Sequence, residues 1–126
     1  MLEASQLAER AGHLALEKKA RDVLILDLSK LTGAADRFVV CTGDSETQVK
    51  AIADHIVEKL GAEGSKPWHV EGAEGRRWML LDFVDVVVHV FYNETRGFYS
   101  LETLWGDAPV TRLDDGARED DAREIA

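Results

Sequence analysis

The hydrophobic positions of the chain follow a helical period in two segments. Within residues 3–19, Leu7, Ala11 and Leu14 recur at helical spacing, which predicts an N-terminal helix. Its apolar stripe is narrow and rich in alanine, so we expect this helix to pack at the edge of the domain. The second helix is predicted to carry a wider stripe, made of Val49, Ile52, Ala53, Ile56 and Leu60.

The ends of the second helix are also marked in the sequence. Ser45 followed three residues later by Gln48 fits a capping box, in which both side chains satisfy free backbone N–H groups. Gly61 is a common kind of helix stop and is predicted to end this helix.

Five shorter apolar segments have the length of β-strands. Residues 22–28 form a continuous apolar run, which is typical of a strand covered on both faces. The other four segments are residues 37–42, 67–71, 76–83 and 85–92. The last two are joined so tightly at Val84 that an antiparallel pair is predicted. Turns are expected at Gly33 and at residues 72–75, and a short helix over residues 93–106.

This order of elements predicts an α/β (α+β) fold with a mixed five-stranded sheet and flanking helices on one or both faces. A chain of 126 residues fits one folded domain, which we place at residues 1–106. Residues 107–126 hold seven acidic residues and three arginines with few bulky apolar residues. They are therefore predicted to form an acidic, disordered tail.

Charge narrows the class of partner. Fifteen lysines and arginines against 24 aspartates and glutamates leave a net charge of −9. Nucleic-acid affinity depends on cations that neutralise phosphates, so direct DNA or RNA binding is not expected, whereas a basic protein is a suitable partner. No segment has the length and apolarity of a membrane span, and Cys41 alone cannot form an intrachain disulfide. We therefore expect a cytoplasmic location.

One turn could hold a phosphate group. Gly43, Asp44 and Ser45 lie between a predicted strand and a helix N-terminus, where free N–H groups favour anions. Nucleotidyl transfer would also need paired carboxylates for two metal ions, and the strand after the helix offers only Glu71. A capped helix start without chemistry is therefore the favoured interpretation of the turn, and no catalytic residue is predicted.

The histidines and the cysteine do not form a recognisable site. His13, His55, His69 and His89 are scattered at spacings that do not match a local metal site, so neither a metal nor a cofactor is expected. His89 lies among valines and is predicted to be a hydrogen-bonded packing residue. Cys41 lies in an apolar strand, where a thiol is a poor nucleophile.

A protein-binding face is a better candidate. Alternation along the strand puts Trp78, Leu80 and Asp82 on one face, opposite an apolar set that belongs to the core. A tryptophan, an aliphatic residue and a carboxylate together are typical of a binding hot spot. The alternative is that a helix covers this face and that Asp82 binds the backbone. Tyr99 and Glu102 lie together on one side of the helix predicted over residues 93–106.

Several motifs taken together resemble the ribosomal silencing factor (Iojap) family over about residues 5–106. The resemblance is carried by the strand at residues 22–28, residues 36–43 and 52–56, Val70-Glu71-Gly72, the Trp-x3-Asp of residues 78–82, residues 84–90, and Glu94-Thr95-Arg96 through Leu104-Trp105. Each piece alone is weak, whereas their combination is specific.

The resemblance implies a nucleotidyltransferase-like fold without working catalytic carboxylates, in a translation repressor that is not an enzyme. It implies binding to large-subunit ribosomal protein fourteen, a steric block of subunit joining under nutrient limitation, and a homodimer when free. Carried over onto this sequence, the partner surface would consist of Trp78, Leu80 and Asp82, with Tyr99 and Glu102 as further members.

Two other functions remain open at this point. The first is a residual nucleotide-binding or nucleotidyltransferase enzyme that uses Gly43, Ser45 and nearby acids. The second is a generic adaptor whose acidic tail is the active part.

Overall fold

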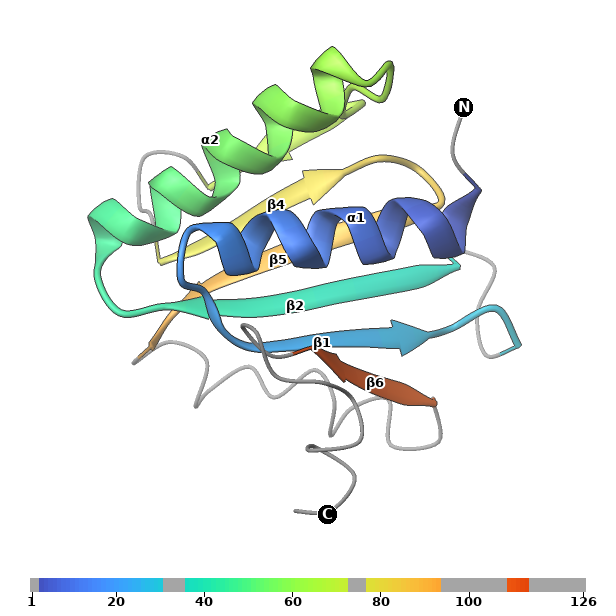
Figure 1. Cartoon of the computed structure of the whole chain (residues 1–126), viewed down its shortest axis with the longest axis horizontal. Coiled ribbons are helices and arrows are strands. Elements are labelled where there is room, and N and C mark those ends of the chain that lie inside the picture. Colours follow the sequence, from blue (N-terminus) through green and yellow to red (C-terminus); the bar gives the residue numbers. More distant parts are fainter. Residues whose placement is uncertain (1–2, 31–35, 73–76, 94–108, 114–126) are drawn as a thin grey trace.

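The computed structural model describes residues 3–30, 36–72, 77–93 and 109–113. Its two helices and six strands follow the predicted order as far as the fifth strand (Figure 1). The elements are α1 (Ala4–Glu17), β1 (Arg21–Asp27), β2 (Arg37–Gly43), α2 (Glu46–Ala62), β3 (His69–Glu71), β4 (Trp78–Asp82), β5 (Val86–Tyr92) and β6 (Val110–Leu113).

All six strands form one mixed sheet in the order β3-β4-β5-β2-β1-β6. The β2–β5 pair is parallel and every other pair is antiparallel, including the predicted β4–β5 hairpin. A parallel pair needs a crossover connection, and the segment between β2 and β5 includes α2. The expectation of a mixed α/β fold is therefore confirmed.

Both described helices lie on the same face of the sheet (Figure 1). Helix α1 packs on β1, β2 and β5, and helix α2 packs on β2, β4 and β5. The prediction that α1 packs at the edge of the domain is therefore wrong. Small residues such as Ala8, Ala11 and Ala15 are fully buried, because their size lets the helix approach the middle of the sheet closely.

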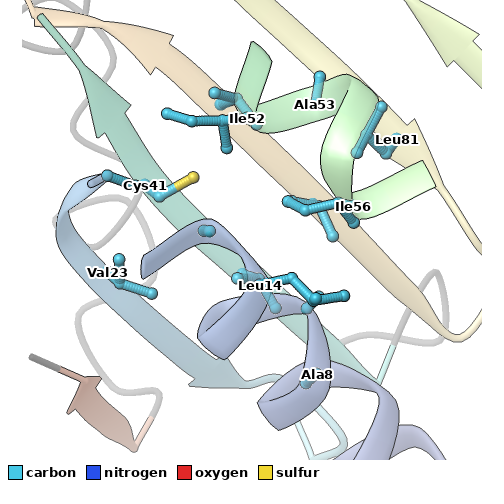
Figure 2. Packing of buried hydrophobic residues seen from close by; sticks show 14 of the residues in the cluster. Ala8, Leu14, Val23, Cys41, Ile52, Ala53, Ile56 and Leu81 are labelled. Atoms are coloured by element: carbon cyan, nitrogen blue, oxygen red, sulfur yellow. The ribbon is translucent and has the colours of Figure 1, made fainter. Parts of the chain in front are cut away.

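The helix-side core contains the apolar stripes of both helices and one face of the sheet. Figure 2 shows Leu14 of α1 and Ile52 and Ile56 of α2 in the same core as Val23 and Cys41 of the strands. All five predicted stripe residues of α2 are buried. The prediction of an amphipathic helix at this position is confirmed.

The ends of α2 differ in detail from the sequence prediction. The Ser45 hydroxyl accepts the Gln48 N–H at 3.0 Å as predicted, but the Gln48 side-chain oxygen accepts the N–H of Asp44 at 2.6 Å. The helix continues through Gly61 to Ala62, so Gly61 does not end it. Gly64 has the positive φ of +97° beyond the helix end, a conformation that glycine adopts without steric cost.

A second, smaller core lies on the other face of the sheet. Leu24, Leu26, Leu28, Val40 and Phe91 are buried there, and Phe38 and Trp78 pack against them. Strand β1 thus contributes buried residues to both cores, as its continuous apolar run predicts.

The sixth strand corrects the sequence analysis. Residues 110–113 pair with β1 although they belong to the predicted disordered tail, so that prediction is wrong for these residues. Leu113 is only 6% exposed. Gly12 of α1 leaves room for its side chain, since a Cβ atom at this position would lie 2.6 Å from the Leu113 Cδ1 atom. The burial of Leu113 and the pairing with the edge of β1 both stabilise the strand, despite its acidic surroundings in sequence. Residues 114–126, Gly33 and the helix predicted over residues 93–106 lie outside the described residues, apart from Asn93.

We predict that Leu113→Ala lowers the free energy of unfolding by about 2–3 kcal/mol, because it empties a buried site between α1 and β1. Denaturant unfolding measures this change. Val110→Ala is the matched control, because Val110 is in the same strand and is 48% exposed, and we expect a change within about 0.5 kcal/mol. Equal stabilities of both variants and the wild type would show that β6 does not contribute to the fold.

Candidate functional site

The candidate site is the face of the sheet that points away from the two helices. Strand β4 alternates as predicted, with Met79 and Leu81 buried in the helix-side core. Trp78, Leu80 and Asp82 are half-buried on the opposite face. Neither described helix covers them, so the alternative of a helix over this face is not what the described residues show. The mixed face of β4 is defined as these three residues.

Asp82 has a structural contact within this face. Its Oδ1 atom accepts the backbone N–H of Val84 at 2.8 Å, so the expected alternative of a backbone-bound aspartate is correct in this respect. Val84 has a φ of +78°, which is strained for a β-branched residue, and it is 57% exposed. The carboxylate therefore stabilises the tight β4–β5 turn and still lies at the surface.

Trp78 is positioned by the neighbouring strand β5. Its indole N–H donates to the Nδ1 atom of His89 at 3.1 Å, and its ring stacks on Phe91 with 5.0 Å between centroids. The cross-strand register explains both contacts, because Trp78 pairs with Phe91 and Leu80 pairs with His89. The tryptophan is thus held by aromatic packing on one side and by an imidazole on the other.

His89 is the residue of this site whose role the sequence analysis missed. It is only 4% exposed, and its ring packs edge-on against the ring of Phe38, with 4.6 Å between the ring centroids. The prediction of a hydrogen-bonded packing residue is confirmed, but its contact with Trp78 was not anticipated. The signal was present, since alternation in β5 puts His89 on the face opposite to the buried valines.

The protonation state of His89 follows from its surroundings. Burial lowers its pKa from 6.5 to about 4, because the charged imidazolium would lose its hydration. Nδ1 accepts the Trp78 N–H, so the proton of the neutral ring lies on Nε2, which is buried without a hydrogen-bond partner among the described residues. Protonation of Nδ1 would break the contact with Trp78.

The Gly43-Asp44-Ser45 turn is occupied by contacts within the chain. The N–H groups of Asp44 and Gln48 are bound by Gln48 and Ser45, and the Asp44 carboxylate pairs with Arg21. These contacts favour the prediction of a capped helix start over a phosphate site. Within the part of the chain that the structure describes, no three histidines, cysteines or acids gather in a way that could hold a metal ion.

The remaining predicted site residues cannot be placed. Tyr99 and Glu102 lie outside the described residues, so their membership of the site stays a prediction.

None of the described helices combines the length and apolarity that crossing a bilayer requires.

Comparison with known proteins identifies what the chain is similar to. The family described as "Ribosomal silencing factor during starvation" matches residues 1–126. The chain is 44% identical over 103 residues to the ribosomal silencing factor of Bacillus subtilis, covering 82% of this chain and 87% of that protein. It is 41% identical over 109 residues to the ribosomal silencing factor of Halalkalibacterium halodurans, covering 86% and 93%. A crystal structure of a protein from Chromobacterium violaceum matches with a TM-score of 0.80 at 40% identity, covering 83% and 88%.

We predict that acid destabilises the protein through His89. The unfolded chain takes up a proton as the pH falls below 6.5, whereas the folded chain stays neutral at His89 down to about pH 4. The free energy of unfolding should therefore fall by about 2 kcal/mol between about pH 7.5 and about pH 5 from this group alone.

The measurement is denaturant unfolding at both pH values for the wild type and for His89→Gln. Glutamine offers an oxygen to the Trp78 N–H but does not titrate, so the variant should lose less stability in acid by about the same 2 kcal/mol. Parallel pH profiles of the two proteins would contradict the assignment of His89 as a buried neutral group.

Proposed function

This chain belongs to the ribosomal silencing factor family, and we propose that it represses translation by binding large-subunit ribosomal protein fourteen. In this proposal the bound protein covers the surface on which the small subunit docks and so blocks subunit joining, chiefly under nutrient limitation. The family membership supports the coarser statement that the chain is a ribosome-associated regulator of translation.

The observation that carries the proposal is the placement of the mixed face of β4. Its register puts Trp78, Leu80 and Asp82 side by side on a sheet face that neither described helix covers. A half-buried tryptophan beside an aliphatic side chain provides apolar area, and the carboxylate sets the orientation of the partner. The net charge of −9 suits a basic ribosomal protein and steers its approach at low salt.

A steric mechanism needs only that the protein binds the large subunit at the surface on which the small subunit docks. A 14.0 kDa domain bound at the surface between subunits occupies space that the small subunit needs. This mechanism agrees with a candidate site that offers contact surface and a fixed tryptophan. It assigns no catalytic step to the chain, and the residual nucleotidyltransferase alternative gains no support from the occupied Gly43-Asp44-Ser45 turn.

We further infer that the free protein forms a symmetric homodimer through the mixed face of β4. An apolar face can pair with a second copy of itself when the natural partner is absent. In this arrangement the dimer and the ribosome complex compete for the same residues.

We predict that Asp82→Asn weakens binding to the large subunit about fivefold without unfolding the protein. Asparagine keeps an oxygen that can accept the Val84 N–H, so the turn is retained and only the charge is lost. Co-sedimentation with separated large and small subunits measures binding, and a subunit-joining assay measures repression. Leu80→Ala should weaken both large-subunit binding and repression of subunit joining by about tenfold, because it removes the central apolar contact.

Asp54→Asn is the matched control, because Asp54 is an exposed aspartate on α2, on the helix side of the sheet. Trp78→Ala alone is less informative, since this residue also packs against the second core, so circular dichroism must accompany it. Wild-type protein that binds neither subunit would contradict the proposed function. Binding that is unchanged by both Asp82→Asn and Leu80→Ala would contradict the proposed face.

We predict that Leu80→Ala also shifts the free protein from dimer to monomer, because the proposed dimer uses the same face. Analytical ultracentrifugation of the free protein measures the oligomeric state. A dimer that persists on bound large subunits would show that the two interactions use different surfaces.

A truncation after Leu113 tests the adaptor alternative while keeping β6, and we expect the truncated protein to retain binding to the large subunit.

A further inference from the structure

The edge strand β3 continues the mixed face of β4 toward a corner of the sheet. In the antiparallel register His69 pairs with Asp82, and Glu71 pairs with Leu80. Directly paired residues point to the same side of a sheet, so His69 and Glu71 lie on the face of Leu80 and Asp82. Leu80 therefore has a carboxylate across the strand pair and another two residues along its own strand.

The part of this face from β3 to β2 differs in charge from its other edge, where Arg112 of β6 pairs with Leu24 of the second core. Among the strand residues that the structure describes on it, from β3 across β4 and β5 to β2, none is a lysine or an arginine. Glu71 is oriented by His69, whose Nε2 atom lies 2.9 Å from its Oε1 atom, and the glutamate side chain is 62% exposed. The carboxylates of Glu71 and Asp82 thus have no lysine or arginine beside them among the described strand residues of this part of the face.

The same corner concentrates exposed apolar side chains. Of the four large hydrophobic residues exposed within the described ranges, Trp68 lies just before β3 and Val84 lies in the β4–β5 turn. Val70 of β3 pairs with Leu81 and therefore points to the helix side of the sheet. Trp68 is 76% exposed, although its backbone N–H donates to the Asp82 carbonyl at 2.7 Å. Its position is therefore fixed by the sheet while its indole remains accessible.

The exposed indole of Trp68 and the exposed carboxylate of Glu71 both lie beside the same imidazole, that of His69. The face of an indole attracts a lysine or arginine cation, and a nearby carboxylate adds a charge-assisted hydrogen bond. The indole of Trp68 lies 5.9 Å from the ring of His69, which contacts Glu71. An apolar partner segment would leave both carboxylates without a counter-charge, so a basic segment fits this corner better.

We infer that the surface that binds the large subunit continues across β3, where Trp68 and Glu71 receive a lysine or arginine side chain of the basic protein partner. This inference rests on the proposed function and extends its contact surface by one strand. Leu80 then lies at the centre of the contact, between the carboxylates of Glu71 and Asp82.

The test compares Trp68→Ala and Glu71→Gln with the wild type in binding to separated large subunits at low and at moderate salt. Each variant should raise the dissociation constant about fivefold at low salt, and Glu71→Gln should make the salt dependence shallower. Both side chains are exposed, so thermal unfolding of the two variants should match that of the wild type.

Two matched controls separate a local contact from general effects. Val110→Ala removes an exposed apolar side chain from the opposite edge strand, β6, and Glu58→Gln removes an exposed carboxylate from α2. Both controls should bind within about twofold of the wild type.

The inference is overturned when either Trp68→Ala or Glu71→Gln binds like the wild type while Asp82→Asn binds weakly, since the proposed contact uses both groups. In that case the contact surface ends at β4 and the proposed function stands. A change in self-association without a change in subunit binding would assign the corner to the homodimer and overturn the inference as well. Absence of wild-type binding would remove the proposed function and this inference together.

Discussion

The parallel pairing of β2 with β5 is the constraint on which the rest of the structure depends. It runs from Arg37 opposite Val86 to Gly43 opposite Tyr92, in the middle of the sheet. Two parallel strands cannot be joined by a hairpin, so the chain must cross over between them, and α2 lies on this crossover. The same register sets Val40 beside His89 on the face away from the helices. A slip of this pairing by one residue would turn His89 toward the helix-side core.

The candidate site combines a stable sheet with one buried polar contact. A neutral imidazole at His89 is costly in acid, yet it gives the Trp78 indole an acceptor and a fixed orientation. A side chain that is already ordered loses less conformational entropy when a partner binds. The Asp82 contact with the strained Val84 turn has the same effect on the carboxylate. The proposed binding residues on β4 are thus preorganised by β5 and by their own turn.

The sequence was sufficient for much of the fold, because period and capping are local properties. The stripe of α2, the Ser45 cap and the alternation of β4 are each encoded within a few residues, and all were predicted correctly. Apart from the helix stop predicted at Gly61, the errors concern long-range packing. The central position of α1 depends on small residues meeting distant strands, and β6 depends on Leu113 meeting Gly12. The Trp78–His89 hydrogen bond required the cross-strand register, which period alone does not give. Tyr99 and Glu102 came from the resemblance and stay predictions.

The position of β6 has a consequence for the order in which the chain can fold. It completes the sheet beside β1, and its Arg112 pairs with Asp22, which lies 90 residues earlier in the sequence. During synthesis β1 and β2 emerge before the other described strands, and the outer edge of β1 stays open until residues 110–113 have left the ribosome. An unpaired edge strand is a template for wrong pairing with other chains. Closing such a long loop is also slow, so the outer edge of β1 depends on the last of the described strands to cover it.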